Sequence, residues 1–543
     1  MDELTLQLLW NRLLAVVEEQ AQTLMRTAFS TVVREAGDLS AGVFDTRGRM
    51  VAQAVTGTPG HVNSMADAVG KFLDKYPLAQ LEPGDVLVTN DPWDGTGHLN
   101  DFTVVTPVFL AEECVALFAS TSHIADVGGR GFGPDANDVF EEGLRIPITH
   151  LFRAGQRNDT LLELVVANVR DGQVALGDLY SLTACNDTGA AALLEAMRDL
   201  QLVSLEAASD AIISRSREAM LEEIRQLPEG KYCYNMVVDG YDEPLNLQAT
   251  LTVHEQGIAV DFAGSSPASA KGINVPLSYT QAYASFGVRC VVGAEIPNNA
   301  GSLEVIRITA PADSILNAPF PRAVSARHSV GQMLPDVVLG CLHQVLPDRV
   351  PAEGASCIWN PVFMHEPGAA AEHQFVINPI FNGGTGARPG LDGLSTTAFP
   401  SGVRTTSTEI NEATSPLVFW QKEYTPDSGG QGTFRGGLGQ TLRVAHAHEQ
   451  PFVISKMFDR VRHAARGRSG GEAGACGAVL CEDAQGNALR HLPGKGRDVV
   501  RGDETLVLQT PGGGGLGAPE QRRSEHQTQD SLDGLTDNSG TGT

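Results

Sequence analysis

The sequence predicts a mixed α+β fold of several domains, with a β-rich core, interspersed helices and a glycine-rich C-terminal half. The chain has 543 residues, enough for roughly three or four ordinary domains. Helical and strand-like hydrophobic patterns alternate through its first part, and glycine becomes frequent from about residue 370. A hydrophobic fraction of 42% is sufficient for buried cores.

The N-terminal region, residues 1–187, is expected to begin with an amphipathic helix. Apolar residues recur there at helical spacing from Trp10 to Ala28, with polar and charged residues between them. A hairpin turning at residues 46–48 follows. The next segments read as strands, at residues 85–89, 102–109 and 114–121. A short acidic turn joins the last two, which therefore should pair as a hairpin.

The middle region, residues 188–350, is predicted to be helical first and β-rich afterwards. Apolar residues are spaced for helices over 188–226, strand-like runs fill 232–263, and an apolar helix is expected over 331–346. The region should end at the Pro347-Asp348 pair, which cannot continue a helix.

The C-terminal region, residues 351–518, is glycine-rich and should contain short strands joined by tight turns. Residues 519–543 have almost no large apolar side chains. Because such a segment buries too little surface to offset its conformational entropy, we expect a disordered polar tail.

The formal net charge is -26, which argues against nucleic acid and anionic membranes as partners, since both favour Lys and Arg. The N-terminus lacks a secretory pattern, and no run of about 18 uncharged apolar residues is present. The eight cysteines form no CxxC pair, as is usual for reduced thiols. These features predict a cytoplasmic protein.

Two His/Asp clusters are the strongest candidates for a functional site. His98 and Asp101 lie in a loop rich in Gly, Pro and Asp before the strand-like run 102–109, and His123 and Asp126 follow the run 114–121. If these runs form a hairpin, their outer ends bring the clusters together. Two imidazoles and one or two carboxylates suit a divalent transition metal, and three protein ligands with an open position are typical of catalytic metal sites.

A structural interpretation of these residues stays open at this point. Each one alone is also explained as a histidine that caps a strand or an aspartate in a turn. Glu35 and Asp38 offer a further pair of carboxylates beside the predicted hairpin near the N-terminus.

Three other motifs carry little weight. Ser469 lies in a GxSxG match without a strand-to-helix context. Gly512, Gly514 and Gly517 match GxGxxG, but a polar segment follows them instead of a helix. Lys71 follows Gly70 without the glycine that a Walker A loop needs at position 65. No motif of this sequence is suited to hold ATP phosphates.

Taken together in their order, a series of motifs resembles the B-type chains of the hydantoinase/oxoprolinase family, which also includes subunits of acetone and acetophenone carboxylases. The resemblance spans nearly the whole chain up to Pro519. Its motifs lie at residues 34–40, 60–62, 84–92, 97–101, 122–129, 141–147, 427–430 and 510–514.

The resemblance implies an ATP-dependent cyclic-amide hydrolase of the 5-oxoprolinase or N-methylhydantoinase type. An A-type ATPase subunit would use ATP to phosphorylate a lactam or hydantoin, and this chain would complete hydrolysis at a divalent metal (Mn, Zn or Fe) within a hetero-oligomer. The metal ligands implied are His98, Asp101 and His123, with Asp38 as a fourth. Glu35 and Asp126 would be catalytic groups near the metal.

Two alternatives remain at the level of sequence. One is a subunit of an ATP-dependent ketone carboxylase of the acetone or acetophenone type, which would use the same metal. The other is a non-catalytic scaffold that stabilises the ATPase subunit. The residues quoted above do not distinguish between a lactam, a hydantoin and a ketone as the substrate.

Overall fold

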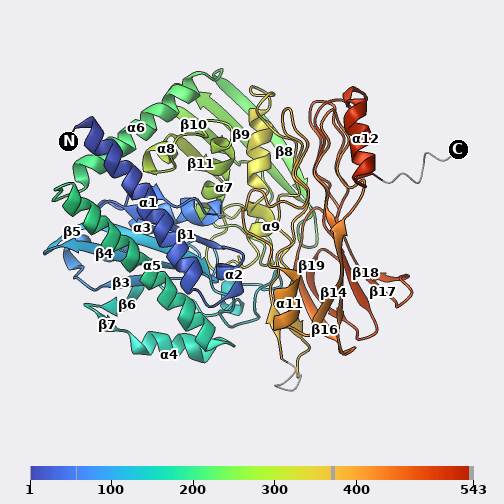
Figure 1. Cartoon of the computed structure of the whole chain (residues 1–543), viewed down its shortest axis with the longest axis horizontal. Helices are drawn as coiled ribbons and strands as arrows, with labels where there is room; N and C mark the ends of the chain where they lie inside the picture. Colours follow the sequence, from blue (N-terminus) through green and yellow to red (C-terminus); the bar gives the residue numbers. More distant parts are fainter. Residues whose placement is uncertain (1, 57, 369–373, 537–543) are drawn as a thin grey trace.

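The computed structural model describes residues 2–56, 58–368 and 374–536. The N-terminal and middle elements gather on one side of the molecule and the C-terminal strands on the other (Figure 1). The mixture of helices and several separate sheets confirms the predicted α+β class. Within the described ranges, no helix is long and apolar enough to cross a membrane.

The N-terminal region is built on a seven-stranded antiparallel sheet in the order β2-β1-β5-β4-β3-β6-β7. The predicted hairpins, β1–β2 and β4–β5, are both present. The strands are β1 (Leu39–Phe44), β2 (Met50–Gln53), β3 (Val86–Thr89), β4 (Asp101–Leu110), β5 (Glu113–His123), β6 (Thr149–Arg153) and β7 (Gln156–Arg157).

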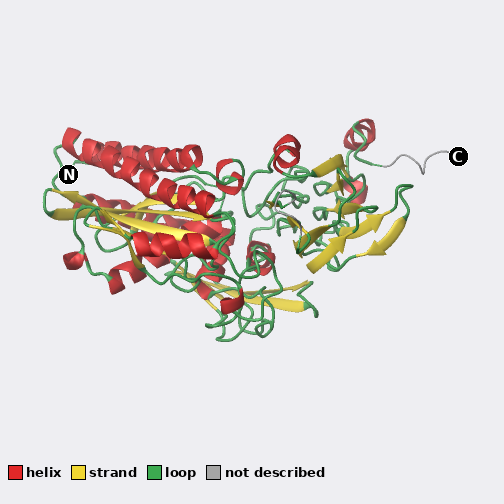
Figure 2. Cartoon of the chain, turned by 90° about the horizontal axis from the view of Figure 1, so that it is seen from below, coloured by secondary structure: helices red, strands yellow, loops and turns green. Residues whose placement is uncertain are grey.

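Helices cover both faces of this sheet (Figure 2). The opening helix α1 (Glu3–Thr27) and α5 (Gly172–Asp199) pack on one face, and α3 (Pro59–Lys75) packs on the other. Strands covered on both faces are mostly apolar, and β4 and β5 are buried along most of their length, with apolar residues and a few Ser and Thr. The shorter helices here are α2 (Thr31–Arg34), η1 (Leu78–Gln80), η2 (Val139–Glu141) and α4 (Asp159–Asn168).

The middle region contains a four-stranded sheet in the order β11-β10-β9-β8, in which only β11 runs parallel to its neighbour. Helices α7 and α10 pack against this sheet. The elements are α6 (Glu206–Arg225), β8 (Gly230–Val238), β9 (Leu245–His254), β10 (Gly257–Asp261), α7 (Leu277–Arg289), α8 (Ala300–Glu304), β11 (Ile306–Thr309), α9 (His328–Gly331) and α10 (Leu334–Leu342).

The apolar helix predicted over 331–346 is present as α10, which is shorter than predicted and is preceded by a separate short helix, α9. Helix α9 ends at Gly331, and α10 begins at Leu334 with Pro335 in its first turn. Proline lacks the N–H that a helix interior requires and is tolerated in the first turn. It therefore starts a new helix here.

Two antiparallel sheets form the regular part of the C-terminal region, in the orders β13-β12-β16-β19 and β14-β15-β20-β17-β18. Their elements are β12 (Val362–His365), β13 (Val376–Ile377), α11 (Thr408–Thr414), β14 (Leu417–Tyr424), β15 (Gln440–His446), β16 (Phe452–Met457), β17 (Ala478–Glu482), β18 (Ala488–His491), β19 (Lys495–Val500) and β20 (Thr505–Gln509).

Glycine-rich segments outside these strands pack backbone against backbone. The N–H of Gly430 donates to the carbonyl of Gly513 (2.8 Å), and the N–H of Gly513 donates to the carbonyl of Gly437 (2.9 Å). A Cβ atom on Gly436 would collide with the carbonyl oxygen of Gly513. Only glycine permits so close an approach of two backbones, so the high glycine content reflects packing as well as turns.

A buried group of charges connects the C-terminal region to the middle region. Glu353 accepts a hydrogen bond from Tyr234 Oη on β8 (2.7 Å) and pairs with Arg466 Nη2 (2.7 Å). Its second oxygen lies 3.3 Å from Nη1 of Arg460, whose side chain is 1% exposed. Because Glu353 and Arg460 are both shielded from water, each depends on the other for its charge partner, whereas Arg466 binds from the more exposed side.

The disordered tail predicted from residue 519 is wrong for its first part. Residues Pro519–Gln521 form the turn η4, and Ser524–Leu532 form the helix α12. Arg522 holds this segment, since its guanidinium pairs with Asp392 (2.8 Å) and Asp530 (2.7 Å). Ion pairs around one buried arginine thus substitute for apolar burial, while residues 537–543 lie outside the described residues.

Candidate metal centre

Three neighbouring strands of the N-terminal sheet place the acidic and imidazole groups of the site in a row. Asp101 opens β4 directly opposite His123, the last residue of β5. This approach confirms the predicted hairpin. On the other side of β5, the N–H of His123 donates to the carbonyl of Asp38, just before β1 (3.3 Å). Residues from distant parts of the N-terminal region thus meet at one edge of the sheet.

His98 completes the cluster from the loop between β3 and β4. Its Nε2 lies 2.6 Å from Asp101 Oδ1, and His123 Nδ1 lies 3.4 Å from the same oxygen. One ligand atom from each of the three side chains lies within 4.8 Å of the others, and all three side chains are buried. These residues can hold a metal ion.

The second oxygen of Asp101 is engaged by other groups. Oδ2 lies 2.9 Å from Nε2 of His61 on α3 and accepts a hydrogen bond from Thr96 Oγ1 (3.0 Å). The guanidinium of Arg327, just before α9, also donates to it. Oδ1 of Asp101 therefore faces the two histidines of the cluster, whereas Oδ2 is bound by His61, Thr96 and Arg327.

The protonation states of the cluster suit a metal ligand set. Burial alone would raise the pKa of Asp101, but the nearby His61 and Arg327 hold it well below its usual range. Burial and the positive charge of Arg327 lower the pKa of His98 to about 4. An ionised carboxylate and a neutral imidazole are the forms that bind metals.

Unpartnered nitrogen atoms also favour a metal at this position. Among the residues that the structure describes, His123 Nε2 and His61 Nδ1 are buried without a hydrogen-bond partner. Leaving a buried polar atom unpaired costs about 1–3 kcal/mol, and a bound ion or its water would remove that cost. The donor set of imidazole nitrogens and carboxylate oxygens fits Zn, Mn or Fe.

Asp38 lies in the same cavity, outside the closest group. Its Oδ1 accepts a hydrogen bond from Thr58 Oγ1 (2.9 Å) and lies 3.6 Å from His61 Nδ1. The structure therefore brings Asp38 next to the cluster, beside His61 and outside the three closest ligand residues.

The cavity around the cluster is narrow and draws its walls from all three regions of the chain. Its volume is about 30 Å³, room for an ion with bound water and too little for a substrate ring. Phe132 packs its ring against His98, His123 and His328. The wall that faces the cluster comes from the middle and C-terminal regions and consists of Tyr279, Arg327, His328, Gln332, Ile358, Asn360, Asn378, Ile380 and Ser401.

Glu35 and Asp126, expected to be catalytic groups, are placed elsewhere. Glu35 accepts a hydrogen bond from Arg34 (3.0 Å) and is partly exposed. Asp126 pairs with Arg170 and accepts a hydrogen bond from the N–H of Gly128. Neither side chain belongs to the described lining of the cavity, so the structure does not bring these two together with the other four.

Sequence reasoning assigned no role to His61, Arg327 or His328, which contact or face the cluster. The motif at residues 60–62 includes His61, but no sequence pattern indicates that this histidine contacts Asp101. Arg327 and His328 lie more than 200 residues beyond His98 in the sequence and follow no periodic pattern. Only the tertiary contacts that the segment around α9 makes with His98 and Asp101 bring them into the site.

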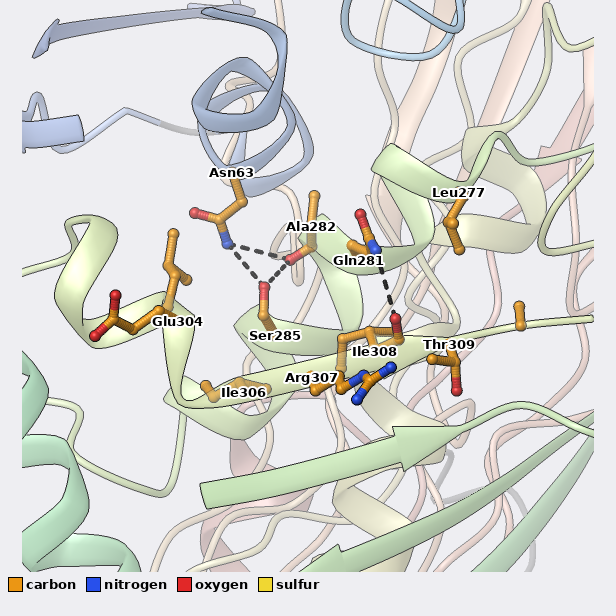
Figure 3. A pocket seen from close by; sticks show the side chains of 12 residues that line it. Asn63, Leu277, Gln281, Ala282, Ser285, Glu304, Ile306, Arg307, Ile308 and Thr309 are labelled. Atoms are coloured by element: carbon orange, nitrogen blue, oxygen red, sulfur yellow. Dashed lines mark hydrogen bonds between the residues drawn. The ribbon is translucent and has the colours of Figure 1, made fainter. Parts of the chain in front are cut away.

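A second pocket, of about 570 Å³, is lined in part by α3 and α7 (Figure 3). The same two helices contribute His61 and Tyr279 to the metal centre. Asn63 on α3 donates to the carbonyl of Ala282 and to Ser285 Oγ on α7, both at 3.2 Å. These bonds fasten α3 to α7. Since His61 lies two residues before Asn63, they also fix the helix that presents His61 to Asp101.

The weaker sequence motifs have structural explanations. Gly512 and Gly514 belong to the close-packed glycine segments. Ser469 has a positive φ of 53° and its Oγ lies 3.3 Å from His343 Nε2. Nδ1 of His343 has no partner among the described residues, so the pair lacks the third group that activates a serine nucleophile.

With this geometry established, similarity to known proteins identifies the family. The family model described as Hydantoinase B/oxoprolinase matches residues 2–519. The chain belongs to this family. The result confirms the resemblance drawn from the ordered motifs, and the match ends where the polar C-terminal segment begins.

Several relatives of this Hydantoinase B/oxoprolinase protein align over nearly its full length. The B chain of a putative D-/L-hydantoinase from Pseudomonas sp. (strain NS671) is 28% identical, covering 98% of this chain and 93% of the relative. The beta chain of the caprolactamase from Pseudomonas jessenii is 26% identical, with coverages of 96% and 92%. 5-Oxoprolinase 1 of Arabidopsis thaliana is 28% identical over 95% of this chain, which spans only 42% of that protein.

Two solved structures share the fold. ATP-dependent caprolactamase from Pseudomonas jessenii superposes with a TM-score of 0.89 at 23% identity, covering 99% of this chain and 95% of that one. Acetone carboxylase in a nucleotide-free structure superposes with a TM-score of 0.86 at 17% identity, covering 98% and 78%. The architecture is thus common to a caprolactamase and a carboxylase.

Proposed function

We propose that this chain is the metal-bearing subunit of an ATP-dependent cyclic-amide hydrolase of the 5-oxoprolinase or hydantoinase type. The observation that carries the proposal is the buried cluster of His98, Asp101 and His123, with Asp38 beside it, in a chain of this family. The names of the aligned relatives, which include hydantoinase, caprolactamase and 5-oxoprolinase, support the substrate class.

His98, Asp101 and His123 would hold a divalent metal, and Asp38 is the candidate for a fourth ligand. When bound, such a metal lowers the pKa of a coordinated water and polarises a reacting carbonyl group. Within the chain, Arg327, Thr96 and His61 fix the position of the Asp101 carboxylate through contacts with its Oδ2. The cavity is narrow, which limits the access of bulk water that would hydrolyse a reactive intermediate unproductively.

The proposal includes a partner subunit that uses ATP. A lactam is a poor electrophile, and phosphorylation of its oxygen supplies a good leaving group. The hydantoinase and caprolactamase relatives are each named as one subunit of a larger enzyme, which supports a hetero-oligomer. The partner would be an A-type ATPase subunit, and the activated lactam or hydantoin would have to reach the cavity through an opened wall.

The test uses the complex of this chain with its cognate ATPase subunit. We expect ATP-dependent opening of 5-oxoproline or a hydantoin without bicarbonate, and about one metal ion per copy of this chain by elemental analysis. A strict bicarbonate requirement with a carboxylated product would show a ketone carboxylase instead, and would overturn the hydrolase assignment.

Ligand variants separate catalysis from a scaffolding role. H123A and H98A complexes should lose the metal and more than about 100-fold in activity, because each removes a direct ligand. The matched control is H254A, since His254 is an exposed histidine at the end of β9, and it should keep both. Full activity and metal content in H123A and H98A would mean that the chain is a non-catalytic scaffold.

A further inference from the structure

One buried carboxyl group near the metal centre has no role in the proposal above. Glu142 directly follows η2, and its side chain is almost completely buried. Oε1 accepts hydrogen bonds from the N–H groups of Val324 and Ser325, both at 2.7 Å. Oε2 is buried without a partner among the described residues. Burying a carboxyl group with one oxygen unpaired costs free energy. The backbone segment that Glu142 binds shows what this cost supports.

The backbone held by Glu142 is the segment that reaches into the metal centre. The carbonyl oxygen of Ser325 lies 2.9 Å from Nδ1 of His98. Two residues later, Arg327 donates to Asp101 Oδ2, and His328 lines the cavity. A single carboxyl group therefore anchors the segment that contacts two of the three ligand residues.

The bond between Ser325 and His98 determines how the imidazole can bind a metal. A carbonyl oxygen only accepts hydrogen bonds, so Nδ1 of His98 must carry the proton. Nε2 then has a free lone pair, and it is the nitrogen that points toward Asp101 Oδ1 (2.6 Å). Metal-binding histidines commonly have their orientation and tautomer fixed in this way by an acceptor behind the ring.

We propose that Glu142 is a positioning residue that holds the Ser325 carbonyl in place and thereby fixes the ring orientation and tautomer of His98 for metal binding. The inference rests on the proposed metal site. It adds a residue that touches neither the metal ligands nor the cavity lining and acts on them through two backbone N–H groups and one carbonyl.

The test measures metal affinity of the full chain by competition with a chelator, using Zn²⁺ and Mn²⁺ as probes. Glu142→Ala removes the acceptor and should weaken binding about 10–100-fold. Glu142→Gln keeps an oxygen acceptor on a side chain of the same length and should bind nearly as wild type. Glu141→Gln is the neighbouring control, since Glu141 pairs with Arg130 at the surface, and it should change nothing.

Further measurements keep the proposal testable if Glu142→Ala does not fold. Glu142→Asp retains the carboxyl group on a side chain too short to reach both N–H groups, and it should alter the visible absorption spectrum of the Co²⁺-substituted protein. Wild-type affinity and an unchanged spectrum in a folded Ala or Asp variant would overturn the positioning role alone. Failure of the wild-type protein to bind either probe would overturn the metal site itself.

Discussion

The N-terminal and C-terminal regions achieve dense packing by different means. In the N-terminal region, apolar side chains from α1, α3 and α5 fill both faces of the seven-stranded sheet. In the C-terminal region, segments such as those around Gly436 and Gly513 press backbone against backbone and leave no space for a Cβ atom. The C-terminal region also has a hydrophobic core around Trp359 and Phe363, so one chain can combine side-chain packing with glycine segments that leave no room for side chains.

The largest expected effect comes from adding a methyl group where backbones touch. Gly436→Ala should destabilise the protein by more than about 4 kcal/mol or prevent folding, because its Cβ would collide with a carbonyl that cannot move independently. Urea unfolding followed by circular dichroism measures this. A loss below about 1 kcal/mol would show that the glycine segments are loosely packed.

The buried charges at the boundary with the middle region should give the next largest effect. Glu353→Ala leaves Arg460 and Arg466 without their main partner and should cost about 3–5 kcal/mol in the free energy of unfolding. Glu353→Gln keeps hydrogen-bonding atoms for Tyr234 and the arginines, and its loss should be smaller. Equal losses in both variants would contradict the importance of the acceptor geometry.

The titration of Glu142 should make stability depend on pH. Burial raises its pKa to about 8 from an ordinary 4.5. Between these values the folded state keeps a proton that the unfolded state has lost, so the stabilisation is complete below pH 4.5 and is lost as pH rises toward 8. The free energy of unfolding should fall by up to about 1.4 kcal/mol per pH unit from this group.

Glu142→Gln removes this pH dependence, because an amide does not titrate. Unfolding of both proteins with EDTA present, at pH 5, 6, 7 and 8, gives the comparison: the stability of wild type relative to Glu142→Gln should decline steadily across the series. A constant difference at all four pH values would show that Glu142 ionises normally in the folded protein.

The smallest effect, with the opposite sign, is expected for the same glycine-to-alanine change in the N-terminal region. Gly70 lies within α3, and no atom apart from the neighbouring backbone of the helix lies within 4 Å of the position that its Cβ would take. Alanine is the better helix former by up to about 1 kcal/mol. Gly70→Ala should therefore stabilise the protein slightly, which the same urea unfolding measures; destabilisation would weaken the contrast with Gly436.

The predictable parts of the molecule were those governed by local pattern. The two strand-like runs joined by a short acidic turn predict the hairpin of β4 and β5, and with it the approach of Asp101 to His123. The family resemblance predicts Asp38 as a further ligand, and the pairing of β1 with β5 explains why Asp38 lies next to His123. These contacts follow from neighbouring strands, which sequence periodicity can indicate.

The remaining site residues depend on contacts that no local pattern encodes. Arg327 reaches Asp101 only because the middle region packs on the N-terminal sheet. Glu35 and Asp126 have the right chemistry for a general base, but the nearby Arg34 and Arg170 pair with them outside the cavity. Likewise, the sequence predicts only turns in the glycine-rich segments. Their close packing joins residues about 80 positions apart, and a local pattern cannot indicate such contacts.

The distribution of the cavity walls along the chain sets an order of events during synthesis. Asp38, His98, Asp101 and His123 have all been made once residue 123 is complete, whereas Asn360 and Ser401 close the cavity from the other side. The backbone around this wall is hydrogen-bonded to segments as far along the chain as Gly513 and Gly514. The side chains proposed to bind a metal therefore leave the ribosome nearly 400 residues before the opposite wall is complete, and an ion can reach them from solvent during that interval.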